Sequence, residues 1–285
     1  MIAVTGATGQ LGRLVIASLL RRVPAEQIIA AARTPSKAAD LATLGVQVRE
    51  ADYSKAATLA KAFAGATRLL LISSPSIDNR VAEHKAAIDA AKTAGVELLA
   101  YTSVLRADTS TLLVAPDHWA TEQYLTASGI AWVLLRHPSY IENYTASLGS
   151  ALEHGVIAGA AGNGRNSAVT RADLADAAAI VLTTPGRAGK IYELGSDVAF
   201  TMAEFAAEVS DQSGTNVIYS DMTQHAYQAL LEKVGVPSKF ASLIADSDAK
   251  AATHGELYTA SRDLSGLIGR PTTTLAAAVA TALPG

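Results

Sequence analysis

The sequence contains no cysteine, and this absence removes several kinds of chemistry at once. Disulfides, thiolate nucleophiles and cysteine-ligated metal sites are excluded, and the composition fits a reducing compartment. Charge is also sparse and nearly balanced. With a formal net charge of -3 over 285 residues, no basic field indicates nucleic acid or anionic lipid as a partner.

Long hydrophobic runs are missing as well. No stretch approaches the roughly 20 apolar residues of a membrane span. The first residues, MIAVTGATG, place no basic segment before their short apolar run, so we predict no signal peptide and expect a cytoplasmic protein. The sequence does contain 49% hydrophobic residues, enough at this length for one large domain or a domain with a smaller lobe.

Short apolar runs alternate with helical patterns up to about residue 136. The expected strands are 2–5, 28–32, 46–48, 68–73, 97–103 and 132–136, and the expected helices are 10–22, 36–44, 55–64, 80–94 and 117–128. Such alternation indicates βαβ units with right-handed crossovers. The predicted fold class is therefore α/β, a doubly wound parallel sheet of Rossmann type.

The alternation loosens after His137 and Pro138. Helical patterns are expected at 143–154, 170–183, 201–213, 224–234, 239–252 and 274–283, with a glycine-rich loop over 155–166 and a strand at 190–194. We predict a dinucleotide-binding domain over 1–137 and a smaller, mostly helical, substrate-side lobe over 138–285. Some segments of this second part are expected to return to the first domain.

The segment Val4–Gly12 spaces three glycines as G-x-x-G-x-x-G between an expected strand and an expected helix. Gly6 permits a tight turn, Gly9 lets the backbone approach a pyrophosphate, and Gly12 allows the helix to pack closely. The helix N-terminus then offers free N–H groups and partial positive charge to the anion. A turn that serves geometry alone is the alternative, but the context favours dinucleotide binding. The predicted contacts are Gly6, Thr8, Gly9, Gln10, Leu11 and Gly12.

The end of the second expected strand indicates which dinucleotide. An acid there usually binds the ribose 2′-OH of NAD, whereas an arginine accommodates the 2′-phosphate of NADP. This strand is followed by Arg33, then Lys37, with no acid before Asp40. NADP(H) is the predicted cofactor, and a solvated surface arginine is the alternative.

Two further polar segments follow expected strands, and each has two interpretations. Ser73 and Ser74 end the fourth strand, where their hydroxyls either line the nicotinamide side or satisfy the turn backbone. Asp52 and Tyr53 follow the third strand, where they either lie near the adenine or cap the helix that follows. We count Ser73 and Ser74 among the cofactor-binding residues.

No Tyr-x-x-x-Lys pair, the proton donor of many nicotinamide-dependent reductases, stands in the helix after the fifth strand. That helix instead carries His118 and Glu122, which share one helix face. A solvated helix face is the favoured interpretation of this pair, and an acid–base pair is the alternative. Ser103, at the carboxyl end of the fifth strand, is where a reacting substrate would sit.

The absence of a Tyr-x-x-x-Lys proton donor restricts the kind of acceptor that the protein is expected to reduce. Hydride delivery to a ketone gives an alkoxide whose conjugate acid has a pKa near that of water, about 15.7. Delivery to a quinone gives a phenolate whose conjugate acid resembles tyrosine, with a pKa of about 10. The difference between these two pKa values corresponds to roughly 8 kcal/mol of free energy. A quinone therefore needs far less help from an enzyme acid, and a cationic dye carbon needs none.

The glycine segment, Arg33 and the absent pair together resemble the NmrA-like group of atypical short-chain dehydrogenases. Within it, the sequence is most similar to the type 2 NAD(P)H:quinone oxidoreductases and the triphenylmethane reductases. The similarity runs nearly end to end, through MIAVTGATGQLG, LLLISS, AYTS, LEHGVIAGAAGNG, VTRADLADAAA and LIGRPTTTL. The resemblance implies an NADPH site at Gly6–Gly12, Arg33, Ser73 and Ser74.

The resemblance also implies that the loop after the sixth strand contributes to the nicotinamide and acceptor side. That loop commonly reads Leu-Arg-Asn in this group, but here His137 stands at the asparagine position, while Tyr140 and Asn143 remain. The change puts the transfer of the asparagine contacts in doubt, and a turn residue before Pro138 is the alternative for His137. The candidate substrate-side residues are Ser103, His137, Tyr140 and Asn143.

The predicted function is NADPH-dependent reduction of quinones, with a planar small molecule as partner and with water, Ser103 or His137 supplying the proton. Reduction of triphenylmethane or azo dyes is the close alternative. A non-catalytic NADP-binding redox sensor that reports to a protein partner is the alternative from a different class, because fold does not fix function.

Overall fold

The computed structural model describes residues 1–283 and divides into two compact units, which we call the Rossmann unit and the C-terminal unit. The Rossmann unit comprises Met1–Ala107, Pro116–His137 and Arg171–Tyr192, and the C-terminal unit comprises Asp108–Ala115, Pro138–Thr170 and the chain from Glu193 onward. The chain thus first leaves the Rossmann unit for a long segment after His137 and returns to it at Arg171. A substrate-side role for the C-terminal unit stays a prediction.

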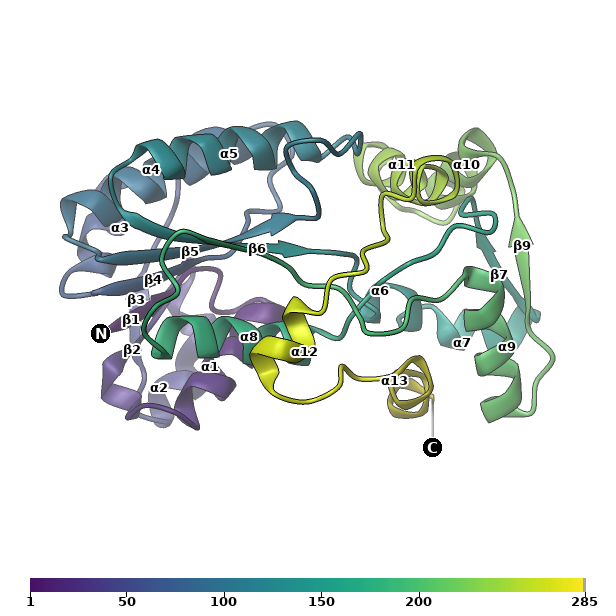
Figure 1. Ribbon diagram of the computed structural model, residues 1–285, viewed down its shortest axis with the longest axis horizontal. Coiled ribbons are helices and arrows are strands. Elements are labelled where there is room, and N and C mark those ends of the chain that lie inside the picture. Colours follow the sequence, from purple (N-terminus) through teal and green to yellow (C-terminus); the bar gives the residue numbers. More distant parts are fainter. Residues whose placement is uncertain (284–285) are drawn as a thin grey trace. The chain divides into compact units, whose positions relative to one another are not determined.

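The Rossmann unit is built on a seven-stranded sheet with the order β3-β2-β1-β4-β5-β6-β8 (Figure 1). The strands are β1 Ile2–Val4, β2 Ile28–Ala32, β3 Gln47–Glu50, β4 Arg68–Leu71, β5 Leu98–Val104, β6 Ala131–His137 and β8 Lys190–Glu193. The pairs from β3 through β6 are all parallel. The predicted fold class is confirmed.

Helices cover both faces of this sheet, as Figure 1 shows. One face carries α3 Ala56–Phe63, α4 Arg80–Thr93 and α5 Ala115–Ala127, and the other carries α1 Gln10–Leu20, α2 Ala39–Thr43 and α8 Arg171–Thr183. Strands β1 and β2 are buried along their whole length, as expected for a parallel sheet covered on both sides. The fully buried side chains of Phe63, Ile88 and Tyr101 fill the space under α3, α4 and α5.

The order of the strands reverses between β1 and β4. Strand β2 pairs with one side of β1, and β4 pairs with the other, with Val4 opposite Leu70. In open parallel sheets the crevice at such a reversal, beyond the carboxyl ends of the strands, is where ligands bind. The glycine segment after β1 and the Ser73–Ser74 segment after β4 leave the sheet at this point.

The C-terminal unit is mostly helical but contains a small sheet that the sequence did not predict. Val156–Gly159 forms β7, which pairs in parallel with β9, Ile218–Asp221. The prediction of a continuous glycine-rich loop over 155–166 is therefore wrong. The strand is only four residues long and its hydrogen-bonding partner lies about 60 residues further along the chain, so no local pattern indicates the pairing.

The helices of this unit are α6 Glu142–Thr145, α7 Leu148–His154, α9 Met202–Ser213, α10 Gln224–Lys233, α11 Ser238–His254, α12 Asp263–Ile268 and α13 Leu275–Ala282. The single helix expected over 143–154 is broken into α6 and α7, and α12 was not predicted. Phe200, Phe205 and Val279 lie in the core of this unit, where Tyr144 packs edge-on against Phe200.

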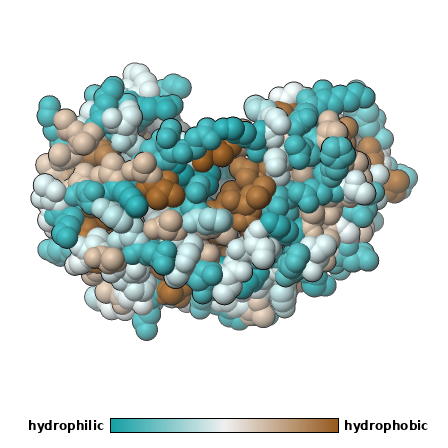
Figure 2. Space-filling model, turned by 90° about the horizontal axis from the view of Figure 1, so that it is seen from above, coloured by the Kyte–Doolittle hydropathy of each residue, from teal (hydrophilic) through white to brown (hydrophobic). Residues whose placement is uncertain are grey.

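Among the helices of residues 1–283, none has the length and apolar character needed to cross a bilayer. In Figure 2, hydrophilic and hydrophobic side chains are intermixed over the face that is shown.

One buried carboxyl in the C-terminal unit is energetically unusual. Asp248, on α11, is only 6% exposed and accepts a hydrogen bond from the backbone N–H of Ala160 at 3.2 Å. Burial raises the pKa of this carboxyl to about 6, the Ala160 bond opposes the rise, and the nearby Asp221 adds to it. The folded state therefore holds this proton more tightly than the unfolded chain, whose carboxyl has its ordinary pKa of 3.8.

We expect this carboxyl to make the protein less stable as pH rises. The stabilising contribution of this carboxyl to the free energy of unfolding is fully present below about pH 4 and is lost as pH rises through 6. The difference between the two pKa values corresponds to about 3 kcal/mol. Asp248→Asn should therefore gain up to about 3 kcal/mol in unfolding free energy relative to the wild type between pH 4 and pH 7. Denaturant unfolding at both pH values measures this. Asp211→Asn, at an exposed carboxylate, controls for the lost charge, and equal pH profiles for wild type and Asp248→Asn would contradict the expectation.

Candidate functional site

The glycine segment forms a tight turn that leads straight into α1. Gly6 has φ 60°, in the left-handed region that glycine adopts without strain, and its carbonyl accepts a hydrogen bond from the Gly9 N–H at 2.9 Å. Gly9 is the N-cap of α1 and supplies no side chain to cap it. The first amides of α1 are therefore left without a side-chain acceptor.

Gly12 is required by packing against this turn. A Cβ atom at position 12 would collide with the carbonyl oxygen of Gly6 and would lie 2.9 Å from Cα of Ala7. Leu11 beside it points its side chain into the core, at 6% exposure, so only its backbone can face a ligand. The start of α1 therefore suits a pyrophosphate for three reasons. Its first amides are uncapped, the turn before it leaves no space for side chains, and the positive end of the helix dipole points toward the turn.

The turn is also tied to the neighbouring strand. The Thr5 hydroxyl donates to the carbonyl of Leu70 at 3.2 Å and accepts from the N–H of Ile72 at 2.9 Å. A Cβ on Gly6 would lie 3.6 Å from Cβ of Ile72, which is ordinary contact distance. These contacts join the glycine turn to the end of β4, so that the two segments form one surface at the reversal of strand order.

The charges near the end of β2 suit a phosphate. Arg33 follows β2, is exposed, and forms no hydrogen bond or ion pair with any residue of 1–283. Asp40, the first acid after the strand, is bound by the Arg13 guanidinium at 2.5 Å, and the hydrogen bond from Arg13 lowers the pKa of that carboxyl. The first acid that follows β2 along the chain is thereby paired with a partner on α1, and the Arg33 guanidinium is available to a ligand.

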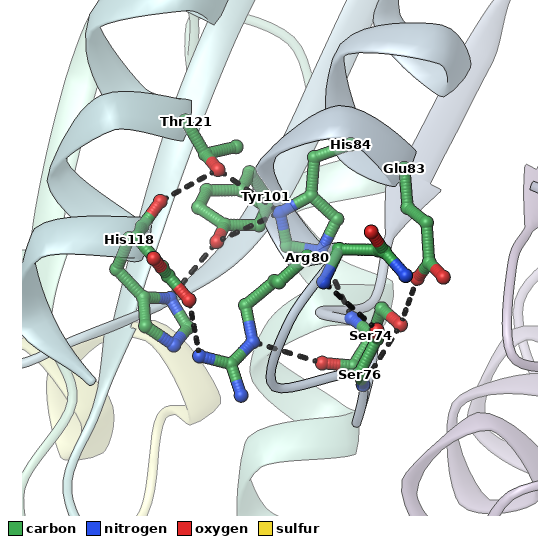
Figure 3. A network of polar contacts seen from close by, with 10 residues as sticks. Ser74, Ser76, Arg80, Glu83, His84, Tyr101, His118 and Thr121 are labelled. Carbon is green, nitrogen blue, oxygen red and sulfur yellow. Dashed lines mark hydrogen bonds and ion pairs between the residues drawn. The ribbon is translucent and has the colours of Figure 1, made fainter.

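Ser73 and Ser74 lie at the end of β4, and the structure distinguishes them. The Ser74 hydroxyl donates to the Glu83 carboxylate and accepts from the N–H of Ser76 at 3.1 Å, so it satisfies the turn (Figure 3). The backbone N–H of Ser73 donates to Thr102 Oγ1 at 2.8 Å. For Ser74 the turn interpretation agrees with these contacts.

Asp52 and Tyr53 follow β3. The Asp52 carboxylate accepts hydrogen bonds from the backbone N–H and the hydroxyl of Ser54, at 3.0 and 2.7 Å. It thus orders the turn before α3 and does not cap the helix, whose N-cap is Lys55. The Tyr53 hydroxyl donates to the carbonyl of Ile72 at 3.4 Å, which places this ring beside the end of β4.

Ser103 and His137 are both buried at the carboxyl ends of neighbouring strands. Their exposed fractions are 3% and 5%, and β5 pairs with β6 so that Val104 lies opposite His137. Burial lowers the pKa of His137 to about 3, so its imidazole is neutral near pH 7 and cannot act as a cationic acid. Ser103 Oγ is buried and makes no hydrogen bond with the residues of 1–283, so this hydroxyl is an unsatisfied polar group at the carboxyl end of β5.

The interpretation of His118 and Glu122 as a solvated helix face is wrong, and they do not form an acid–base pair either. Glu122 is fully buried and accepts two hydrogen bonds from the Arg136 guanidinium, at 3.0 and 2.6 Å. His118 is 7% exposed and its Nδ1 lies 2.9 Å from the Tyr101 hydroxyl. The two side chains therefore contact different partners between α5 and the sheet, which a helix-face pattern alone does not reveal.

Tyr140 and Asn143 belong to the C-terminal unit, where Tyr140 lies between β6 and α6 and Asn143 lies within α6. Tyr140 is half-buried and forms an isolated parallel bridge with Val169, and Asn143 is exposed. The next residue, Ile141, donates its N–H to the Val169 carbonyl at 2.9 Å, so the segment is fixed by its backbone. A substrate-side role for Tyr140 and Asn143 stays a prediction.

Sequence reasoning missed the residues that hold the Ser73–Ser74 segment. They are Arg80, His84 and Thr102, all nearly or fully buried. The spacing of Arg80 and His84 at i, i+4 in the helix after the segment was the available signal. No cluster of three or more His, Cys, Asp or Glu suited to a metal ion occurs in residues 1–283.

Comparison with known proteins identifies the family. A family model described as NAD(P)H-binding matches residues 6–185, which include the glycine turn and most of the Rossmann unit. The chain is 51% identical to quinone oxidoreductase 2 of Escherichia coli K12 over 98% of its own length and 97% of that protein. It is 28% identical to the NAD(P)H azoreductase of Xenophilus azovorans, over 85% of this chain and 84% of that protein.

Solved structures agree with these relatives. The NADPH complex of an E. coli NADPH-dependent quinone oxidoreductase has a TM-score of 0.95 and 50% identity, with 99% of each chain covered. The NADP(H) complex of a Citrobacter triphenylmethane reductase has a TM-score of 0.95 and 41% identity, covering 99% of this chain and 100% of that one. The chain therefore belongs to the NAD(P)H-binding family, in the group that contains quinone oxidoreductase 2 and triphenylmethane reductase.

Proposed function

We propose that this protein reduces quinones with NADPH by direct hydride transfer. The observation that carries the proposal is an intact glycine turn, with an uncapped α1, at the strand-order reversal of a chain that is 51% identical to quinone oxidoreductase 2 along nearly its whole length. The turn supplies the site for a pyrophosphate, and the relative supplies the class of acceptor.

The residues of this chain have distinct tasks in the proposed reaction. The first amides of α1 bind the pyrophosphate, and Arg33 binds the 2′-phosphate through charge-assisted hydrogen bonds. The backbone after β4 borders the same site. When bound, reduced nicotinamide supplies the hydride. The protein contributes mainly by orienting the two reactants, which accounts for a large part of the acceleration in such reactions.

The structure strengthens the argument that the acceptor needs no strong acid. Burial lowers the pKa of both His84 and His137 to about 3, so neither imidazole is protonated near pH 7 and neither can act as a cationic acid. Burial likewise lowers the pKa of His118 and raises that of the Tyr101 hydroxyl beside it. The hydroxyl of Ser103 and water remain as proton sources. Such weak acids suffice for a phenolate product, because this anion is stable enough to form before it is protonated, whereas an alkoxide needs a stronger acid as it forms.

Reduction of dyes is a second candidate function. The 41% identical structure is that of a triphenylmethane reductase, and a 28% identical relative is an azoreductase. A cationic dye carbon accepts hydride with no proton at all, so the absence of a charged acid is equally compatible with it. The two candidates share the cofactor site and differ only in the acceptor.

The first prediction concerns the choice of acceptor. Purified protein should oxidise NADPH with benzoquinones or naphthoquinones and should be inactive with simple ketones, because only the former give an anion that needs little help from an acid. Loss of NADPH absorbance measures the reaction, with triphenylmethane dyes assayed in parallel. Turnover with ketones but not quinones would refute the proposal, and binding of NADPH without any turnover would favour a redox sensor.

The second prediction concerns selectivity between the two cofactors. Arg33→Glu should raise the Kd of NADPH about ten- to a hundredfold, because one charge-assisted hydrogen bond is lost and a charge repulsion is added. The same substitution should change the Kd of NADH by less than about threefold. The Kd of each cofactor measures this. Arg22→Glu makes the same charge change at an exposed position beyond the far end of α1. Equal weakening of both cofactors by Arg33→Glu would exclude the phosphate role.

The third prediction concerns the glycine turn. Gly12→Ala should displace the turn from the start of α1 and weaken NADPH at least about tenfold, because the new methyl group has no space beside Gly6 and Ala7. Gly149→Ala, within α7 and with no atom near its added Cβ, should leave NADPH binding unchanged and increase stability by about 0.5–1 kcal/mol. An unaltered Kd in Gly12→Ala would show that the turn does not hold the cofactor.

A further inference from the structure

The segment that follows β4 is held by buried side chains through its backbone. The N–H of Ser74 donates to Nε2 of His84 at 2.9 Å, and the carbonyl of Ser74 accepts from Nε of Arg80 at 3.1 Å. One residue earlier, the Ser73 N–H donates to Thr102 Oγ1 at 2.8 Å. Three side chains from α4 and β5 therefore fix consecutive backbone groups of this segment, and Figure 3 shows the two from α4, Arg80 and His84, beside Ser74.

His84 can hold Ser74 in only one protonation state. Because Nε2 accepts a hydrogen bond, it carries no proton, and a neutral ring has its single proton on Nδ1. That nitrogen lies 3.0 Å from Thr121 Oγ1, whose own hydroxyl donates to the carbonyl of Asp117 at 2.8 Å. Thr121 is thereby left as an acceptor, and the ring is oriented with Nε2 toward Ser74.

The surroundings keep the ring neutral. His84 is fully buried, and burial, followed by the charge of Arg80, lowers its pKa to about 3. Arg80 in turn is 7% exposed and pairs with the Asp117 carboxylate at 3.0 Å. The ring therefore remains an acceptor throughout the neutral pH range, and the contact to Ser74 does not depend on a titration.

The segment so held lies where the proposed cofactor binds. It begins one residue after Ile72, whose N–H is bound by Thr5 and whose Cβ would lie 3.6 Å from a Cβ on Gly6. A displacement of the Ser74 backbone would therefore alter the surface beside the glycine turn. Sites of this kind need their geometry held to a fraction of an ångström by supporting hydrogen bonds.

We propose that His84 is a positioning residue for the NADPH site, which holds the segment after β4 in its binding conformation by accepting the Ser74 N–H at Nε2. The inference rests on the proposed function for the identity of the ligand. It gives a task to a buried histidine that does not contact the reacting groups, and Thr102 has the same task at Ser73.

Two substitutions at His84 separate this role from simple core packing. The side-chain oxygen of glutamine can take the place of Nε2, whereas the shorter asparagine amide corresponds to the Nδ1 side of the ring. His84→Asn should keep the contact to Thr121, lose the one to Ser74 and raise the Kd of NADPH about tenfold. His84→Gln should restore the Kd to within about threefold of the wild type, with kcat at saturating NADPH similar in all three proteins.

Amide hydrogen exchange of the cofactor-free protein supplies an independent readout. Exchange over residues 72–79 should accelerate in His84→Asn and stay near the wild-type rate in His84→Gln, with the rest of the Rossmann unit unchanged. Exchange accelerated equally in both variants across the whole unit would overturn the proposal, since that result means a packing role. If His84→Asn does not fold, Thr102→Val tests the same segment from β5, with Thr102→Ser expected to restore binding.

The outcomes also separate this inference from the proposed function. If the wild type and His84→Asn bind NADPH with the same Kd, the positioning role is overturned, and the proposed quinone reductase activity is unaffected. Wild-type protein that does not bind NADPH overturns both. An increased Kd in His84→Asn with rescue in His84→Gln supports the positioning role whichever acceptor the protein reduces.

Discussion

The backbone pairing of β1 with β4 is the constraint on which the candidate site depends. It places Val4 opposite Leu70, so that the two chains leave the sheet side by side and in the same direction. The Thr5 hydroxyl then joins them beyond the last ladder hydrogen bond, through the Leu70 carbonyl and the Ile72 N–H. A slip of one residue in this pairing would turn every side chain of β4 to the other face and would separate the glycine turn from its neighbour.

Burial gives the polar groups behind this site an unusual character. His84, His118 and Tyr101 lie between the sheet and the helices α4 and α5, in a hydrogen-bonded group whose members are held neutral by desolvation. Such groups contribute orientation, since each buried donor is directed to one acceptor. They are poor sources of a proton. The chemistry of the site is therefore expected to rest on the cofactor and the acceptor, and the contribution of the protein on placement.

The relatives are consistent with this division of labour. Proteins named for quinones, triphenylmethane dyes and azo compounds share the fold or much of the sequence of this chain. Hydride delivery to a quinone gives a phenolate, and delivery to the cationic carbon of a triphenylmethane dye gives a neutral product, so neither acceptor requires a strong acid. A site that orients reactants without a dedicated acid suits both of these acceptors, and the acceptor is then selected by the shape and polarity of the substrate side.

The sequence by itself determined the Rossmann sheet, the glycine turn and the absence of a Tyr-x-x-x-Lys pair. Those features are local, because a strand period, a glycine spacing or a missing motif is complete within a few residues. Only the tertiary structure decided that β7 pairs with β9, that Glu122 binds Arg136 and that His84 holds Ser74. Each of these contacts joins segments that local patterns describe separately. Whether His118 faces water or Tyr101 depends on which helix face the sheet covers, a choice that the long-range packing makes.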